Sequence, residues 1–293
     1  MKTLDELICR LGRSEKKVAV AQAADYEVLR AIKKAVELKL ATFLLTGNET
    51  TIKQMASDVE LDLSEVEIFN CSNDYAAKEA VKKVREGKAH VLMKGHIDTK
   101  SLVKEVLNKE YGLRTGRVLS HVALFEIPNQ ERLVFLTDSA MNIAPTLDEK
   151  AQIIQNAVEV ATQSGWVNPK VAPIAAVEVV NSAMPATIDA ASLTQMNRRG
   201  QINHCIIDGP LAFDNAVSKE SAELKGIKSE VAGVADILMV PTIEVANTLY
   251  KSFMYFAEGK VAAVVSGAKA PIILTSRSDS AESKLYSLAL ALQ

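Results

Sequence analysis

Short apolar runs rich in β-branched residues alternate along the first half of the chain with longer segments in which apolar residues recur every three or four positions. Such runs are typical of buried strands, and the wider spacing is typical of amphipathic helices. The pattern predicts helices at 25–38 and 73–86, with a Gly-Asn turn after the second predicted strand. The predicted strands of this half are 17–21, 41–46, 66–69 and 89–93.

The second half repeats this alternation. It predicts strands at 171–180, 202–208, 237–241, 262–265 and 272–275, and helices at 148–164, at 189–196 and from Ser280 onward. Continuous apolar strands separated by helices indicate a mostly parallel sheet covered on both faces, and hence an α/β protein. In such sheets ligands bind where the carboxyl ends of strands lead into helices. The residues just after each strand are therefore the candidates for chemistry.

The composition fits a globular chain and argues against several classes of partner. Its 293 residues carry a formal charge of −2, which gives no basic field for nucleic acid or an anionic membrane. The N-terminal stretch mixes charges with apolar residues, unlike a signal peptide, and no apolar run reaches about 18 residues. Cys9, Cys71 and Cys205 lie far apart without CxxC spacing, which argues against disulfides or a zinc site. We therefore expect a cytoplasmic protein.

The first loop with chemical promise follows the strand predicted at 89–93 and contains Lys94, Gly95, His96 and Thr99. A glycine lets backbone N–H groups approach a phosphate, Lys94 supplies positive charge, and Thr99 supplies a hydroxyl. A solvated lysine at the end of a strand fits the same residues. His96 fits an ordinary surface histidine better than a base.

A second loop contains Arg114 and Arg117, both flanked by glycines. Guanidinium groups hold phosphate oxygens in a fork, so the two could form an anion clamp. A β-turn with two exposed arginines is an equal alternative. The Ser120-His121 pair that follows lacks a GxSxG motif, which argues against a serine hydrolase.

Two further loops follow predicted strands of the second half. Asp208 and Asp214 could bind a divalent metal, but no third acid or histidine stands at ligand spacing, and Asp214 also suits a helix N-cap. Asn247 and Lys251 are four residues apart on a predicted helix and share one face. That face could meet a phosphate or a pantetheine amide, or it could be plain surface.

The last predicted strand leads directly into Thr275-Ser276-Arg277-Ser278-Asp279-Ser280. This segment offers hydroxyls, a guanidinium and a carboxylate, although Asp279 or Ser280 could simply cap the following helix. The chain has neither a GxGxxG after a strand nor a Walker GxxxxGK[ST] motif, so a nicotinamide site and a nucleoside triphosphatase are unsupported.

Taken in order, these loops resemble the phosphate acetyl/butyryl transferase family. The resemblance runs nearly end to end and in register. It is closest to the phosphate butyryltransferase branch in KGHIDT, LRTGRVLSHV and SRSDSAESK. The segments that carry it lie at 19–35, 92–102, 113–122, 138–161, 171–193, 208–218, 231–252 and 266–284.

The resemblance implies a reaction in which acyl-CoA and inorganic phosphate give acyl phosphate and CoA, with CoA as substrate and no metal or other cofactor. It implies two α/β/α domains with an interdomain cleft, on a scaffold like that of isocitrate and isopropylmalate dehydrogenases. We expect the first domain to comprise 1–137 and 270–293, and the second 138–269. The resemblance also implies a homodimer or larger homo-oligomer.

The resemblance also assigns roles. Ser276 and Arg277 match the family's Ser-Arg pair, but Ser283 stands where its acetyltransferases have a catalytic aspartate, six residues after the arginine. Asp279 and Glu282 are the nearest carboxylates, and we expect Asp279 to act as the base. The family's PDLEAGN-like segment is matched at Pro241, Glu244 and Asn247, with Thr242 in place of the aspartate.

Direct attack in a ternary complex needs a base, a hydrogen-bond donor to the oxyanion and a phosphate-binding site. We expect Asp279 and Arg277 in the first two roles, with Ser276 beside them. The phosphate and CoA contacts are expected from Lys94, Gly95, Thr99, Arg114, Arg117, Ser120, Asn247 and Lys251. A phosphate acetyltransferase, another enzyme on the same scaffold and a catalytically silent CoA- or acyl-phosphate-binding protein are the alternatives.

Overall fold

The computed structural model describes residues 1–128, 130–275 and 279–293, and within them the chain forms two compact units. Unit 1 comprises Thr3–Arg117 and Val261–Gln293, and unit 2 comprises Val118–Lys260. The domain boundaries expected from the sequence, after residues 137 and 269, stay a prediction.

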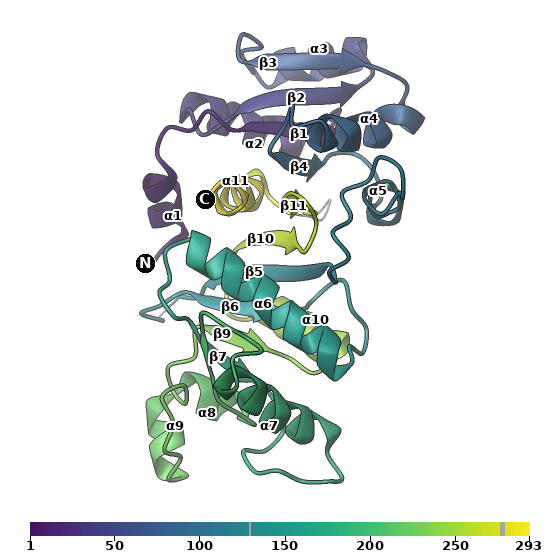
Figure 1. The fold of residues 1–293 in the computed structure, drawn as a ribbon. Helices are drawn as coiled ribbons and strands as arrows, with labels where there is room; N and C mark the ends of the chain where they lie inside the picture. Colours follow the sequence, from purple (N-terminus) through teal and green to yellow (C-terminus); the bar gives the residue numbers. More distant parts are fainter. Residues whose placement is uncertain (129, 276–278) are drawn as a thin grey trace. The chain divides into compact units, whose positions relative to one another are not determined.

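Unit 1 contains a sheet with the strand order β3-β2-β1-β4-β11-β10 (Figure 1). Every pair from β3 to β11 is parallel, whereas β10 and β11 form an antiparallel hairpin. The strands are β1 (Lys17–Ala21), β2 (Thr42–Gly47), β3 (Val66–Asn70), β4 (Val91–Lys94), β10 (Lys260–Ser266) and β11 (Ile272–Ile273). The side chains of 18–21 are fully buried, as expected for a central strand with helices on both faces.

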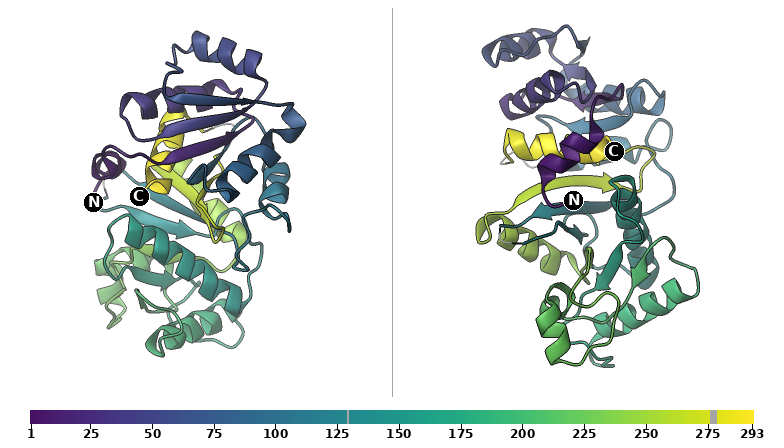
Figure 2. Two further views of the ribbon diagram at one scale, coloured as in Figure 1. Left: turned by 45° about the horizontal axis from the view of Figure 1, so that its top comes forward. Right: turned by 90° about the vertical axis from the view of Figure 1, so that its left-hand side faces the viewer.

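The helices of unit 1 pack on this sheet and on one another. Helix α4 contacts β1 and β2, while α11 contacts α1, α2 and β11. Figure 2 shows the yellow α11 beside the purple α1 and α2, so the last helix of the chain packs against the first two. These helices are α1 (Leu4–Leu11), α2 (Tyr26–Glu37), α3 (Glu49–Asp58), α4 (Asn73–Arg85), α5 (Thr99–Val106) and α11 (Ala281–Ala291).

Unit 2 has the strand order β5-β6-β9-β7-β8. The pairs from β6 to β8 are parallel, and β5 runs antiparallel to β6. Because of this direction, the start of β5 lies at the same edge as the carboxyl ends of the parallel strands. The strands are β5 (Ser120–Glu126), β6 (Val134–Thr137), β7 (Lys170–Pro173), β8 (Ile206–Ile207) and β9 (Ile237–Met239).

The helices of unit 2 include α6, which contacts β5, β6 and β9, and α10, which contacts β6. A capping box formed by Thr146 and Glu149 starts α6, the longest of them. They are α6 (Leu147–Gln163), α7 (Pro185–Arg198), α8 (Phe213–Val217), α9 (Lys219–Leu224) and α10 (Ile243–Tyr255). The structure confirms the predicted α/β fold with mostly parallel strands.

Several predicted elements were wrong in detail. The strand expected at 171–180 ends at Pro173, and Val179 and Val180 beyond it are exposed. Asp214 is not a helix cap, because α8 begins at Phe213 with Ala212 as its N-cap. Strands β5 and β6 and helices α1, α3 and α9 had no predicted counterpart. Ser280 does cap α11, since its Oγ accepts from the N–H of Ser283.

Candidate functional site

Lys94 is the last residue of β4 and is only 5% exposed. Its Nζ donates to the carbonyl oxygens of Gly95 at 3.3 Å and Ile97 at 3.1 Å. A solvated lysine was the alternative left open by the sequence, and the structure excludes it. The ammonium is instead held under the loop that follows β4, at the carboxyl edge of the sheet.

Gly95 is required by the close approach of β4 to β1. A Cβ at this position would lie 2.2 Å from the carbonyl oxygen of Gln22 and 2.7 Å from that of Ala21. The N–H of Gly95 already donates to Ala21 O at 2.9 Å. In this conformation Gly95 therefore contributes its small size, and its N–H is not available to a phosphate.

Thr99 is exposed and begins α5, as predicted, but Asp98 occupies the helix terminus as the N-cap. The carboxylate of Asp98 accepts from the N–H of Ser101 at 2.9 Å, and hydrogen bonds from Ser101 lower its pKa. The Nδ1 of the exposed His96 lies 3.5 Å from Asp25 Oδ2. The end of this loop thus carries acidic groups as well as the hydroxyl of Thr99.

Arg114 and Arg117 are both exposed in the loop that leads to β5. Their loop is attached to the turn before β11, because Thr115 Oγ1 donates to Gly267 O at 2.5 Å and Lys269 N donates to Leu113 O at 2.8 Å. Lys94, by contrast, stands at the carboxyl end of β4. Unit 1 therefore holds these cations near opposite ends of the β4–β11 pair.

The segment after β11 is partly described. Ser276 and Arg277 lie outside the described residues, and so does Ser278. Thr275 is 6% exposed, and its Oγ1 has no hydrogen-bond partner among the residues that the structure describes. Asp279 is half-buried just before the cap of α11.

Glu282, the other carboxylate considered as a base, is turned to a different neighbour. The hydroxyl of Tyr286 donates to Glu282 Oε1 at 3.2 Å and to Asp5 Oδ1 at 2.8 Å. Burial and the hydrogen bond to Asp5 raise the pKa of Tyr286, so it stays a donor. These contacts place Glu282 toward α1, whereas Asp279 lies directly before Ser280, the cap of α11.

Lys284 and Glu27 were not singled out in the sequence, although they lie at the same carboxyl edge. Lys284 is 2% exposed, and its Nζ donates to Asp279 O at 2.5 Å. Glu27 Oε2 accepts from the N–H of Ala281 at 3.0 Å. The sequence did carry a signal for Lys284, because it is a lysine in a predicted helix whose pattern is otherwise apolar.

In unit 2, Ser120 begins β5 and is fully buried. Its Oγ accepts from Asn156 Nδ2 at 2.8 Å, and the same amide donates to Val118 O at 2.9 Å. The hydroxyl therefore faces α6 and the protein interior. A direct contact with substrate stays a prediction that this conformation does not display.

Beside Ser120, a buried polar cluster was missed entirely. Asp138 follows β6 and accepts from the N–H groups of His121, Ala140 and Met141 at Oδ1, and from that of Asn142 at Oδ2, all at 3.0–3.1 Å. Ser139 Oγ lies 2.8 Å from His121 Nδ1. An Asp-Ser pair directly after the apolar run 133–137 was the signal that could have identified it.

Helix α10 carries Asn247 and Lys251 on its exposed face, as the spacing predicted. The buried side of the helix holds Ala246 and Phe253, and the ring of Tyr250 meets those of His121 and Phe125 edge-on. The exposed face fits both alternatives left open, a ligand-binding surface and plain surface. Near the start of α10, hydrogen bonds from the N–H of Glu244 itself and from the side chain of Thr242 lower the pKa of the Glu244 carboxyl.

An apolar hollow of about 750 Å³ opens at the carboxyl ends of β7 and β9 in unit 2. Met184, Phe213 and Val245 in its lining are each 37% exposed. The lining comprises Ile174, Ala175, Ala176, Met184, Pro185, Ala186, Thr187, Phe213, Pro241, Glu244, Val245, Thr248 and Leu249.

Asp208 and Asp214 belong to no metal-binding group: within the described ranges, no three His, Cys, Asp or Glu side chains are placed to hold an ion. In the same ranges, no helix is long and apolar enough to cross a membrane.

The sequence profile of the phosphate acetyl/butaryl transferase family matches residues 2–84 and 73–292. The chain belongs to this family. It is 56% identical over 277 residues to a probable phosphate butyryltransferase of Bacillus subtilis, covering 94% of this chain and 92% of that protein. It is 50% identical over 292 residues to the phosphate butyryltransferase of Clostridium beijerinckii, covering 99% of this chain and 97% of that protein.

Among solved structures, a branched-chain phosphotransacylase from Enterococcus faecalis superposes with a TM-score of 0.83 at 37% identity, covering 94% of this chain and 98% of that one. Membership of the phosphate acetyl/butaryl transferase family confirms the resemblance read from the loops and makes the chain a transferase. It gives the carboxyl edges described above their chemical context.

Proposed function

We propose that this chain is a phosphate butyryltransferase, which transfers a short acyl group between CoA and inorganic phosphate. The observation that carries the proposal is the similarity to phosphate butyryltransferases, at 50% identity over 99% of the chain for one of them. The buried ammonium of Lys94 at the carboxyl edge of unit 1 supports it, because the reaction needs a fixed cation for phosphate.

In the direction of acyl-CoA synthesis, the CoA sulfur attacks the carbonyl carbon of the acyl phosphate. The sulfur loses its proton, the C–S bond forms, and phosphate leaves as the C–O bond breaks. A free thiol has a pKa of about 8.5, so only a few per cent is thiolate near neutral pH. A carboxylate base that accepts the proton during attack accelerates such a step by about 10²–10⁴-fold.

We assign the proton acceptor to Asp279. Asp279 lies in the segment that follows β11, directly before the cap of α11, whereas Tyr286 already engages Glu282, and both observations favour Asp279. Arg277 stays the predicted donor to the developing oxyanion, with Ser276 beside it. Lys94 is the best supported phosphate ligand, because its ammonium is buried at the carboxyl end of β4.

The proposal is tested by measuring phosphate-dependent release of CoA thiol from acetyl-, butyryl-, valeryl- and isobutyryl-CoA. We expect the highest kcat/KM with the four- and five-carbon chains, a loss of about 100-fold in Asp279→Asn, and no change on addition of EDTA. The control is Glu282→Gln, expected to stay near the wild-type rate. Loss in Glu282→Gln alone would transfer the role of base to Glu282.

Two alternatives give different results in the same assay. A phosphate acetyltransferase would prefer acetyl-CoA. A catalytically silent binding protein, which the serine at 283 allows, would bind CoA in a titration without releasing thiol from any chain length. That last result would contradict the proposed function.

We further propose that the protein works in the cytoplasm, with acyl-CoA and phosphate as its small-molecule partners, without a cofactor, nucleic acid or membrane, and as a homo-oligomer. The free cysteines Cys9, Cys71 and Cys205 support a reducing compartment. The hollow of about 750 Å³ supports assembly, since it is far larger than a four-carbon acyl chain needs and is rimmed by exposed apolar side chains.

A further inference from the structure

Lys284 is a buried, charged residue to which the proposed transfer reaction assigns no role. It lies in the first turn of α11 and is 2% exposed. Lysine is almost never buried to this extent without a partner, because removing an ammonium from water costs several kcal/mol. Burial accordingly lowers the pKa of Lys284, and the nearby carboxylates of Asp279, Asp25 and Glu27 act in the opposite direction.

Lys284 contacts Asp279. Its Nζ donates to the carbonyl oxygen of Asp279 at 2.5 Å, five residues back along the chain. Three carboxylates raise the pKa of Lys284, and that of Asp279 has the largest effect of the three. The ammonium thus holds the backbone of Asp279, and the carboxylate of the same residue lies near enough to favour its charge.

A second contact fixes the same short segment from the other side. Glu27, in the first turn of α2, accepts from the N–H of Ala281 at 3.0 Å and pairs with Arg30. The backbone from Asp279 to Ala281 is therefore held by Lys284 of α11 and Glu27 of α2.

Helix formation does not account for Lys284. The terminus of α11 is capped by Ser280, whose Oγ accepts from the N–H of Ser283 at 3.2 Å. A methionine would fill a similar buried volume without the cost of burying a charge. The ammonium at this position is thus unexplained by capping or packing alone.

We propose that Lys284 is a positioning residue, which holds Asp279 in place for proton transfer during acyl exchange. The inference rests on the proposed function and on the assignment of Asp279 as base. Lys284 acts through Asp279 and need not touch either substrate.

A double-mutant cycle tests it, with Lys284→Met, Asp279→Asn and the double variant in the thiol-release assay. We expect Lys284→Met to lower kcat by about tenfold or more while the KM values for acyl-CoA and phosphate change less than about threefold. In the Asp279→Asn background the same substitution should change kcat by less than about twofold, because its route of action is already lost.

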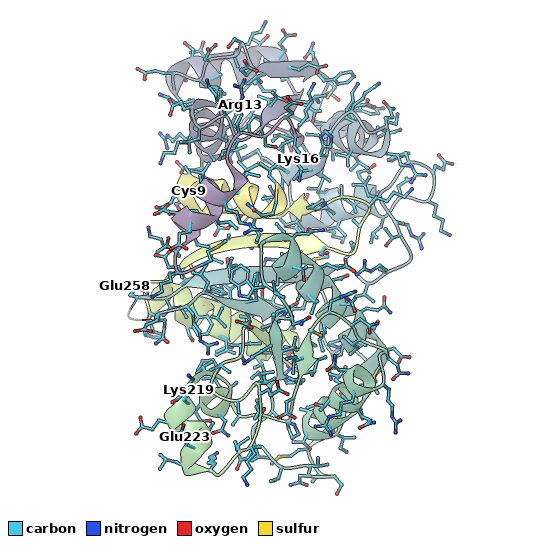
Figure 3. All side chains as sticks on the ribbon, turned by 60° about the vertical axis from the view of Figure 1, so that its left-hand side comes forward. Cys9, Arg13, Lys16, Lys219, Glu223 and Glu258 are labelled. Atoms are coloured by element: carbon cyan, nitrogen blue, oxygen red, sulfur yellow. The ribbon has the colours of Figure 1, made fainter. Side chains whose placement is uncertain are left out.

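Lys16, which directly precedes β1, provides a matched control because it contacts the other end of α11. Its Nζ donates to Leu292 O at 2.7 Å and to Gln293 O at 2.8 Å, just beyond the end of α11 (labelled in Figure 3). Lys16→Met therefore removes a comparable lysine–carbonyl contact far from Asp279 in the helix. We expect a lower Tm and a kcat within about twofold of wild type.

Three outcomes overturn the inference: an unchanged kcat in Lys284→Met, an equal loss in both backgrounds, or an equal loss in Lys16→Met. If Lys284→Met does not fold, Lys284→Gln, which keeps a shorter polar donor, is placed in the same cycle and judged by the same limits. Absence of thiol release by the wild type would instead overturn the proposed function, so the two failures are distinguishable.

Discussion

Lys94 is buried at the carboxyl end of β4, although a lysine that ends a strand is commonly solvated. Its ammonium is held by two carbonyl oxygens of the following loop, at 3.3 and 3.1 Å. These contacts fix a positive charge at the carboxyl edge of unit 1, in a place largely shielded from water. A phosphate oxygen is the ligand that the family's chemistry supplies.

We therefore expect Lys94→Met to lower kcat/KM for phosphate by about 100-fold, because a charge-assisted contact of about 1.5–3 kcal/mol is lost in a water-poor site. Steady-state kinetics with phosphate as the varied substrate measure this. Lys88→Met is the control, since Lys88 is an exposed lysine paired with Glu86. An unchanged KM and kcat in Lys94→Met would remove Lys94 from the phosphate site.

The cysteines differ sharply in accessibility. Cys9 is exposed on α1, where Figure 3 labels it, whereas burial raises the pKa of Cys205 to about 12. Since the thiolate is the reactive form, we expect a disulfide reagent at pH 8 to modify Cys9 within minutes and Cys205 only after unfolding. Mass spectrometry of labelled peptides checks this, and rapid labelling of Cys205 in the native protein would contradict it.

At the scale of elements, the turn after β6 depends on one carboxylate. Asp138 is 3% exposed and accepts four backbone N–H groups as well as the side-chain amide of Asn142. The turn also positions Ser139 against His121. Asp138 therefore supports both the stability of the protein and the geometry of this edge of unit 2.

Asp138→Ala should therefore destabilise the protein by about 3–5 kcal/mol. Each buried donor that loses its acceptor costs about 1–3 kcal/mol, and partial relaxation of the turn lowers the sum. Thermal or urea unfolding followed by circular dichroism measures the change. Asp148→Ala, an exposed position in the first turn of α6, should stay within about 1 kcal/mol. Equal losses in the two variants would refute the role given to Asp138.

The elements that the sequence predicted well are those whose burial alone decides their structure. β1 and α2 carry uninterrupted apolar runs or clear three-to-four spacing, and both formed where predicted. The strand expected at 171–180 failed after Pro173, because the valine-rich run at 177–180 is half-buried at its start and exposed at Val179 and Val180. Periodicity reports apolar character, and it cannot tell a core strand from an apolar surface.

The candidate site shows the same limit. Lys94 and the α10 pair could be named from their places after strands, since carboxyl edges collect ligands in parallel sheets. Asp138 also follows an apolar run, but that run was not predicted as a strand, and Lys284 lies inside a helix. The importance of both comes from contacts with residues distant in sequence, such as Glu27 near Lys284 and His121 beside Asp138. Such contacts become visible only when the sheet is assembled.

At the scale of the whole molecule, the apolar hollow of unit 2 governs the proposed assembly. Val245 lies on its lining and is 37% exposed. A charge placed there would have to be desolvated on association, at a cost of several kcal/mol per ion. The hollow is therefore the place where one substitution should separate the subunits.

We expect Val245→Asp to convert the oligomer to monomers at micromolar concentration, measured by size-exclusion chromatography with light scattering. Val167→Asp, which charges an isolated valine that is 87% exposed, should leave the mass unchanged. An oligomer that persists in Val245→Asp would mean that the subunits associate through another face.

The place of β11 between β4 and β10 also sets the order in which the chain can mature on a ribosome. When residues 1–117 have been synthesised, β4 still lacks one of its neighbouring strands, and the carboxyl edge near Lys94 lacks Asp279 and Lys284. The missing strand and helix emerge only after all of unit 2. The first unit to begin is therefore the last to be finished, and the nascent chain carries an open strand edge, a template for aggregation, through most of its translation.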